Sequence, residues 1–191
     1  MHILLAPDSF KESLSAKQVA EALKKGFQEA LPDATFDLLP IGDGGEGTMD
    51  TLAGVLNLTK KHTQVTGPFG KPVSMAYYQK DKMAFFEMAS LVGLGSIPAE
   101  KRNPLELETR GIGELILQLV DQGVKTICVG IGGSATNDGG IGMAAGLGVA
   151  FYDDQGHLLR PVGASIGRVD RIDTSAVPNA LQDIELLVLT D

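Results

Sequence analysis

A glycine-rich segment, residues 130–140, holds the densest group of residues that could do chemistry. It has five glycines in eleven residues and follows an apolar run at 125–131 that is typical of a buried strand. Glycines between a strand and a helix let backbone N–H groups approach an anion, and the helix N-terminus adds partial positive charge. A plain tight turn would explain only one or two of these glycines. The segment therefore predicts an anion-binding loop, with candidate residues Gly132, Gly133, Ser134, Asn137 and Asp138.

The same segment also matches part of the dinucleotide-binding fingerprint. Gly130, Gly132 and Ala135 have the G-x-G-x-x-A spacing. Asp153 and Asp154 follow about twenty residues later, where the fingerprint places an acidic residue for the ribose. This pattern would indicate an NAD(P)-binding oxidoreductase of the Rossmann type. Taken alone it has little specificity, and the last glycines of the segment stand where the fingerprint needs a continuing helix, so we rank this interpretation second.

Two further polar clusters follow the first two predicted strands. Residues 8–11 follow a strand at 3–6, and residues 42–48 follow a strand at 35–39. Both clusters lie where sites are found, because ligands in open α/β sheets bind outside the carboxyl ends of the strands. The candidate residues are Asp8, Ser9, Lys11, Asp43, Gly44, Gly45 and Glu46.

The chemistry of these clusters suits a phosphate bound together with a cation. Asp43 and Glu46 could hold Mg²⁺ through oxygen, directly or through water, and Lys11 could contact phosphate oxygens. The structural alternatives are an Asx turn at Asp8 and a solvated glycine-rich loop at 43–47. Each cluster alone leaves both interpretations open.

Arg102 is a candidate for binding a carboxylate, because a guanidinium can hold one through two parallel hydrogen bonds. It precedes Asn103 and Pro104, which stand at N-cap and first-turn positions for a helix that we expect to end at Gly123. A surface residue beside a helix start is an equally good interpretation. The three histidines form no metal-binding spacing, and the chain contains no Walker phosphate loop and no protein-kinase signature.

The elements that must position these residues begin with a β-α-β-α pattern. Ser15 and Gln18 form a capping box before a helix at 16–30. Apolar residues recur every four positions along this helix and predict a buried stripe. The stripe of the helix at 16–30 consists of Val19, Leu23, Phe27 and Leu31. A short second helix is expected at 48–56.

From residue 58 to 88 the pattern changes to antiparallel strands and hairpins, with turns at 67–70 and 81–82. Further on, the strand at 125–131, a helix at 138–147 and a strand at 149–152 predict a βαβ unit. An apolar strand of core type at 184–189 ends just before the last residue. We therefore expect the chain to be incomplete.

Composition limits the classes of partner. The chain has 191 residues, 43% of them hydrophobic, and a formal net charge of −8. This acidity argues against a nucleic-acid or anionic-membrane surface, since both need a basic face. The absence of any apolar run near the ~18 residues of a membrane helix, and of a signal peptide, predicts a cytoplasmic protein. Cys128 has no cysteine partner and is expected in a buried strand.

Four sequence blocks together resemble the signature blocks of type I glycerate kinases, in the same order along the chain. The resemblance covers all 191 residues and makes the Rossmann-like match a coincidence of glycine-rich turns. Thr190 replaces a cysteine that is usual in the family, and Arg110–Gly113 departs mildly from a Ser-Tyr-Gly-Thr-Gly block. The blocks are residues 6–14, 43–48, 102–105 and 130–140.

The resemblance implies two α/β domains around a cleft, one of them flavodoxin-like or Rossmann-like with a parallel sheet. The chain would hold only the first part of both, at 1–58 and 59–191, because family members are about twice as long. The activity of these 191 residues alone is therefore in doubt. A non-catalytic module that binds a nucleotide or a small acid is the remaining alternative, and the oligomeric state stays open, a homodimer included.

The implied reaction transfers the γ-phosphoryl group of ATP to a hydroxyl of D-glycerate, with Mg²⁺, to give 2-phosphoglycerate rather than 3-phosphoglycerate. Asp191 matches the acidic position of the family's Cys-Asp-Val block, and it is our candidate for orienting or deprotonating the attacking hydroxyl. Asp8, Lys11 and Asp43 would organise the phosphates and the metal, with Glu46 as the second metal ligand. Any of the acidic residues could be the base.

Overall fold

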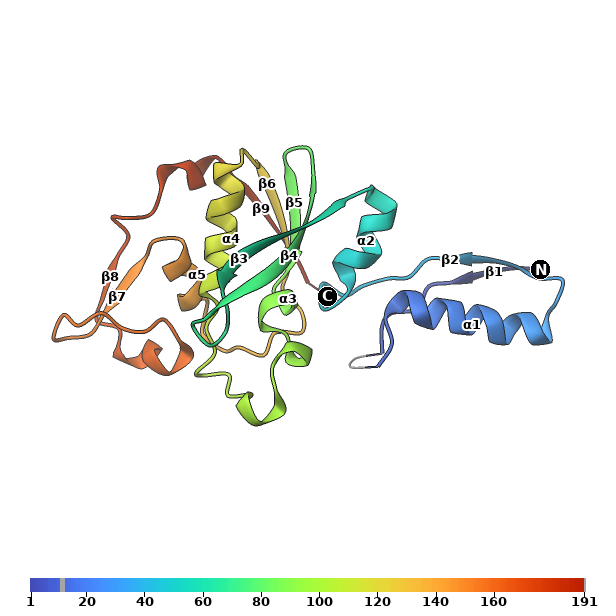
Figure 1. Ribbon diagram of the computed structural model, residues 1–191, viewed down its shortest axis with the longest axis horizontal. Coiled ribbons are helices and arrows are strands. Elements are labelled where there is room, and N and C mark those ends of the chain that lie inside the picture. The colour runs from blue at the N-terminus through green and yellow to red at the C-terminus, as the bar shows by residue number, and fades with distance from the viewer. Residues whose placement is uncertain (11–12, 191) are drawn as a thin grey trace.

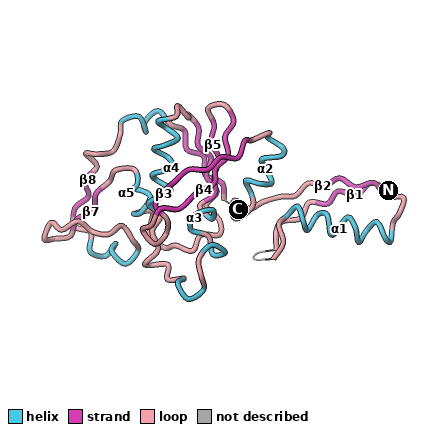
Figure 2. Tube along the Cα trace, viewed as in Figure 1, coloured by secondary structure: helices cyan, strands magenta, loops and turns pink. Residues whose placement is uncertain are grey.

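The computed structural model describes residues 1–10 and 13–190 as a mixed α/β chain (Figure 1). Figure 2 shows strands gathered in the middle of a larger region and a short pair of strands in an N-terminal arm. The helices are α1 (Ala16–Ala30), α2 (Thr48–Leu56), α3 (Ala89–Val92), α4 (Arg110–Asp121) and α5 (Ile141–Gly146), and the short 3₁₀ helices are η1 (Leu94–Ser96), η2 (Ala99–Lys101), η3 (Gly163–Arg168) and η4 (Asn179–Asp183). The strands are β1 (His2–Leu5), β2 (Thr35–Leu38), β3 (Thr59–Thr66), β4 (Pro72–Lys80), β5 (Met83–Glu87), β6 (Thr126–Gly130), β7 (Ala150–Tyr152), β8 (Arg171–Asp173) and β9 (Glu185–Leu189).

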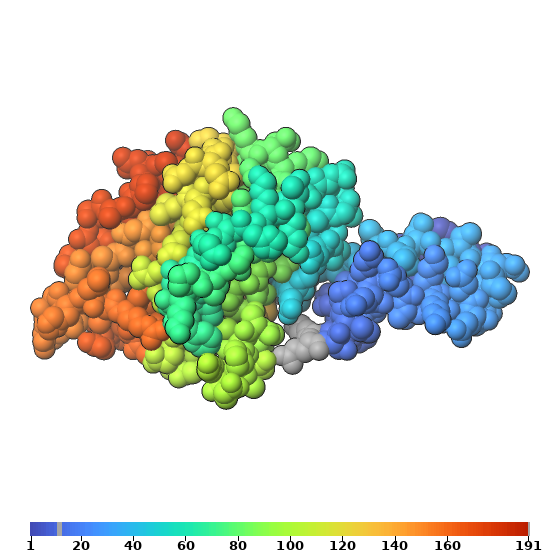
Figure 3. Space-filling view, in the orientation of Figure 1, coloured from blue at the N-terminus to red at the C-terminus, as the bar shows by residue number. Residues whose placement is uncertain are grey.

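The N-terminal arm consists of the parallel strands β1 and β2 with α1 packed beside them. The predicted capping box is confirmed: the Ser15 hydroxyl accepts from the Gln18 N–H, and the Gln18 side chain accepts from the Ser15 N–H. The buried stripe is wrong in part, because Val19 is buried whereas Leu23 and Phe27 are exposed. A sheet of two strands covers only one narrow strip of the helix. Figure 3 shows the arm projecting from one end of the molecule.

In the described residues, β3, β4, β5, β6 and β9 form a five-stranded sheet in that order. Strands β3, β4 and β5 are antiparallel, which confirms the predicted hairpins. Strands β5, β6 and β9 are parallel. Their carboxyl ends therefore meet at one edge of the sheet.

Helices α4 and α2 cover opposite faces of this sheet. Under α4, Ile112, Leu115 and Leu119 pack with Phe86 in the largest core cluster. On the other face, Met49 of α2 packs with a smaller cluster that contains the buried Cys128, as expected for a strand cysteine. The boundary at residue 58 stays a prediction, and α2 packs on the strands that follow that boundary rather than on β1 and β2.

Two sequence predictions about elements are wrong, each because a distant contact decides the local structure. The helix expected from Asn103 starts at Arg110, since Asn103 closes a turn with Leu105 and Glu106 instead. Strand β7 pairs antiparallel with β8 in a separate sheet, so β6, α5 and β7 form no βαβ unit. The strand predicted at 184–189 is present as β9, which lies at the edge of the sheet within the described residues, with about half of the Val188 surface exposed.

Candidate active site

The candidate site lies at the edge where the parallel strands β5, β6 and β9 end. The register places Glu87 of β5 opposite Gly130 of β6, and Gly130 opposite Leu189 of β9. The glycine-rich loop after β6 and the residues after β9 therefore emerge side by side. Asp191, the predicted base, comes after β9 and Thr190 but lies outside the described residues.

The loop before α2 packs backbone to backbone on the loop after β6. The Gly132 N–H donates to the Gly44 carbonyl at 3.1 Å. A Cβ at Gly132 would come 2.8 Å from the Gly45 nitrogen, and one at Gly44, where φ is +84°, would come 2.7 Å from the Leu189 carbonyl oxygen. Close packing of three backbones therefore requires several of these glycines, independently of any anion. The polar cluster at 42–48 and the glycine-rich segment at 130–140 therefore meet here, although the strands that they follow lie in different sheets.

Asp43 and Glu46 lie on this loop. Asp43 is half-buried, and its Oδ1 accepts from the Gly45 N–H at 2.8 Å. Glu46 is exposed and stands against the turn that contains Gly95, where an added Cβ would lie 3.2 Å from its Oε2. Within the described residues, no group of three or more histidine, cysteine and carboxylate side chains could hold a metal ion by itself. Asp43 and Glu46 give this loop two carboxylates. Proteins commonly bind Mg²⁺ through one or two carboxylates when substrate phosphates provide further ligands.

The polar residues of the glycine-rich segment have different surroundings. The Ser134 hydroxyl is 2.7 Å from that of Thr136, and Asn137 is exposed. Asp138 is buried and accepts from the Thr109 hydroxyl and from two N–H groups at the start of α5, those of Gly140 and Gly142. Its carboxylate therefore holds α5 and α4 together.

The first polar cluster approaches the site from the arm. The parallel pairing of β1 and β2 continues beyond the strands, because the Ile41 N–H donates to the Pro7 carbonyl at 3.0 Å. Asp8 is exposed, and its Oδ1 accepts from the N–H of the adjacent Ser9, which is not the bond to the second residue onward that defines an Asx turn. Lys11 lies outside the described residues. Asp8 and Asp43 thus come after two chain segments that lie side by side in the structure.

Arg102 lies in the loop after η2 rather than beside a helix start, which corrects its predicted setting. It is exposed, and its Nε donates to the carbonyl of the buried Ile97 at 2.9 Å. This bond orients the Arg102 side chain, which is exposed at the surface.

The sequence comparison decides the family. The sequence model described as glycerate kinase family matches residues 3–191. The chain belongs to this family.

Individual relatives agree with this assignment. A glycerate kinase of Neisseria meningitidis is 53% identical over the whole chain, and a glycerate 2-kinase of Escherichia coli is 45% identical. A solved structure of a protein proposed to be glycerate kinase 2, from Salmonella typhimurium LT2, matches 98% of the chain with a TM-score of 0.76 and 43% identity. The chain spans about half the length of the curated relatives it matches, 52% and 51% for the first two.

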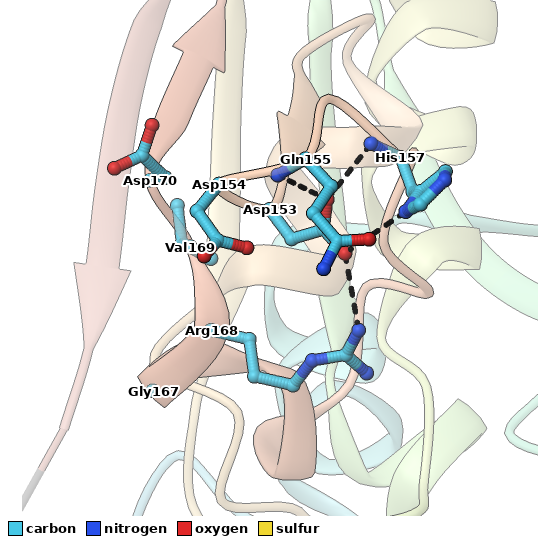
Figure 4. Close-up of a pocket in the computed structure, with 8 residues that line it drawn as sticks. All are labelled: Asp153, Asp154, Gln155, His157, Gly167, Arg168, Val169 and Asp170. Atoms are coloured by element: carbon cyan, nitrogen blue, oxygen red, sulfur yellow. Dashed lines mark hydrogen bonds and ion pairs between the residues drawn. The ribbon is translucent and has the colours of Figure 1, made fainter.

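The dinucleotide interpretation does not fit this member of the glycerate kinase family. The fingerprint needs the acidic residue at the end of a strand parallel to β6, and β7 lies in another sheet. Asp153 is already engaged: it accepts from the N–H groups of Gln155 and His157 and pairs with Arg168 (Figure 4). The N–H of His157 is the main cause that lowers the pKa of Asp153 below its ordinary value. These side chains line a pocket of about 570 Å³, none of whose lining residues belongs to β5, β6 or β9.

The sequence analysis missed two buried polar residues that shape the site, Glu87 and Thr109. Glu87 ends β5, and burial raises the pKa of its carboxyl above the usual value. A signal was available, since an acidic residue ends the apolar run of β5. Thr109 carried no comparable signal, because its role depends on Asp138 and α5.

Among residues 1–10 and 13–190, no helix is long and apolar enough to cross a membrane.

Proposed function

We propose that the full-length protein containing this chain transfers the γ-phosphoryl group of ATP to the 2-hydroxyl of D-glycerate. The main support is the family match over residues 3–191, together with 53% and 45% identity to relatives named glycerate kinase and glycerate 2-kinase. The meeting of the two glycine-rich loops at the edge of the sheet is consistent with it. ATP and D-glycerate are the proposed substrates, and the cytoplasm is the proposed location.

Phosphoryl transfer needs the reactants in line, donors on the phosphate oxygens and a cation. Asp43 and Glu46 are the proposed ligands of Mg²⁺, which when bound would neutralise charge on the phosphates. The loop of Gly132, Gly133 and Ser134 would contact anionic groups, with Asn137 at its rim. Asp138 contributes by holding the start of α5. Asp8, Ser9 and Lys11 would contact the phosphates from the arm.

Asp191 is the proposed group that orients or deprotonates the attacking hydroxyl, because it comes after a strand, β9, whose neighbour β6 leads into the glycine-rich loop. In the full-length enzyme, Asp191→Asn keeps the shape but removes the proton acceptor. We expect kcat to fall by about 10²–10⁴ while ATP affinity stays nearly unchanged. If the variant keeps more than a tenth of the wild-type kcat, the role moves to Asp8 or Asp43.

Arg102 is the proposed partner of the glycerate carboxylate. Arg102→Ala should weaken glycerate binding by about 1.5–3 kcal/mol, which is typical of a hydrogen bond to a charged group. Lys101→Ala is the control, since Lys101 is the adjacent cation and lies over the Phe69 ring. An unchanged KM for glycerate in the Arg102 variant would make Arg102 a surface residue only.

The deciding experiment uses the full-length protein with Mg-ATP and D-glycerate, followed by ³¹P NMR of the product. We expect ADP release only when glycerate and Mg²⁺ are both present, with phosphorus on the 2-position. Glycerate binding without turnover would favour a non-catalytic small-acid module. NADH binding at micromolar affinity, without glycerate-dependent ADP release, would favour the oxidoreductase interpretation.

A further inference from the structure

Glu87 binds the N-terminal turn of a helix that belongs to another part of the chain. It is the last residue of β5 and is only 4% exposed. Its Oε2 accepts from the Gly47 N–H at 3.1 Å, and its Oε1 accepts from the Met49 N–H at 2.5 Å. Both carboxylate oxygens therefore bind backbone groups at the start of α2, which helices ordinarily satisfy with a local cap.

A local cap is not available at this helix. The N-cap position is Gly47, which has φ +87°, a left-handed conformation that favours glycine over the usual capping residues serine, threonine and aspartate. Glycine has no side chain to accept from the first turn, so the acceptor must come from elsewhere. Glu87 provides it from the sheet edge.

The position of Glu87 is electrostatically unfavourable apart from these two bonds. Burial raises the pKa of its carboxyl, and the neighbouring carboxylates Asp50 and Glu46 raise it further, whereas the N–H groups of Met49 and Gly47 lower it. An apolar residue here would avoid the desolvation. The acidic residue therefore requires a role beyond packing.

A chain of short contacts connects Glu87 to the proposed metal ligands. Thr48 lies between the two residues that Glu87 binds, and its hydroxyl accepts from the Gly44 N–H at 3.0 Å. Gly44 is next to Asp43, and Glu46 directly precedes Gly47. Holding the first turn of α2 in place therefore also holds the loop just before it, which carries Asp43 and Glu46.

We propose that Glu87 is a positioning residue, whose buried carboxylate holds the first turn of α2 and thereby sets the place of Asp43 and Glu46 at the sheet edge. The catalytic consequence rests on the proposed function of those two residues. The structural consequence, a loop held by Glu87, does not.

The test uses Glu87→Gln in the full-length protein. A glutamine has one acceptor oxygen, and its NH₂ group would face the second backbone N–H. We expect hydrogen–deuterium exchange of the peptide covering residues 44–52 to accelerate at least about tenfold, the effect of losing one hydrogen bond. Catalysis should fall up to about 10²-fold in kcat, as expected for misplaced groups near the reaction.

Glu114→Gln is the matched control. Glu114 is a half-buried carboxylate whose Oε2 accepts from the Thr66 N–H at 2.6 Å and whose Oε1 accepts from the Thr66 hydroxyl at 2.8 Å. It joins α4 to the end of β3, away from residues 44–52. We expect this variant to lower the midpoint of thermal unfolding but to leave exchange at 44–52 and kcat unchanged.

Glu87→Asp is the second variant, in case the glutamine variant does not fold. It keeps the charge but is one methylene shorter, so it should also accelerate exchange at 44–52. Unchanged exchange in a folded Glu87 variant would overturn the proposal, and so would equal loss of kcat in the Glu87 and Glu114 variants. Accelerated exchange with full activity would overturn the catalytic consequence. If wild-type protein shows no glycerate-dependent ADP release, the proposed function fails, whereas the exchange result still tests the role of Glu87.

Discussion

Helices α4 and α1 are both amphipathic, yet one is in the core and the other is on an open surface. On α4, Leu115 and Leu119 are fully buried against the five-stranded sheet. On α1, Leu23 and Phe27 are each about 40% exposed. The periodic pattern of a helix thus indicates which face is apolar, but the amount of neighbouring structure decides whether that face is covered.

The glycines of the two helices show the same difference. A Cβ at Gly113 of α4 would overlap with the Met143 carbonyl of α5, so the two helices approach closely there. Around Gly26 of α1, no described atom other than those of its chain neighbours and of its own helix backbone would lie within 4 Å of an added Cβ. Glycine is needed for packing in α4, whereas in α1 it only reduces helix propensity.

The largest expected difference is between a buried leucine of α4 and an exposed leucine of α1. In the 191-residue chain, Leu115→Ala should lower the free energy of unfolding by about 2–5 kcal/mol, because it leaves a cavity under α4. Leu23→Ala on α1 should lower it by less than about 1 kcal/mol, since the side chain is 40% exposed. Urea unfolding followed by circular dichroism measures both. Equal effects would mean that the outer face of α1 is covered in solution.

The two helical glycines should respond with opposite signs. Gly113→Ala should destabilise the chain by about 1–3 kcal/mol, because α4 and α5 must move apart. Gly26→Ala should stabilise it by about 0.5–1 kcal/mol through better helix propensity. The same urea titrations compare them. A destabilising Gly26→Ala would contradict the open surroundings of α1.

The start of α4 depends on a buried hydroxyl. The Thr109 hydroxyl donates to Asp138 at 2.5 Å and accepts from the Met143 N–H at 2.9 Å. Thr109→Val keeps the shape and should lower the free energy of unfolding by about 1–3 kcal/mol, because both partners stay buried without it. Thr109→Ser, which retains the hydroxyl, is the control and should have the smaller effect.

The start of α1 depends on a local cap and should show the smallest effect. Ser15→Ala removes the acceptor for the Gln18 N–H and should destabilise α1 by about 1 kcal/mol. Amide exchange in the first turn of α1 is the appropriate measurement, since it reports on the arm alone. Ser15→Asp keeps an acceptor and should leave the exchange close to wild type. Equal acceleration in both variants would exclude the cap as the cause.

Much of the secondary structure could be predicted from local signals. The spans of α1 and α2 agree with the predicted 16–30 and 48–56. For α1 the reason is local, because its capping box and apolar spacing act within a few residues. The prediction from Asn103 was wrong, because the same cap residue can close a turn. The antiparallel partner of β7 could not be predicted, since pairing depends on residues 171–173 and not on the spacing inside the segment.

The candidate site was predictable as a set of segments but not as an arrangement. Residues 43–47 and 130–134 each follow a strand, as predicted, but the two strands lie in different sheets and a backbone contact between the loops brings these segments together. The glycines were interpreted as an anion loop, whereas Gly44 and Gly132 are required by backbone packing as well. Asp138 was expected to bind substrate, and the structure shows it bound to Thr109.

The sequence by itself determined the family, the local helices and strands, and the positions at which acidic and glycine residues follow strands. These properties depend on residue order and on interactions within one or two turns. Only the tertiary structure decided that Glu87 caps α2, that Asp138 binds Thr109 and that one face of α1 is exposed within these 191 residues. Each of these depends on groups 29 or more residues apart or on the area of the neighbouring sheet, and no spacing within a segment contains that information.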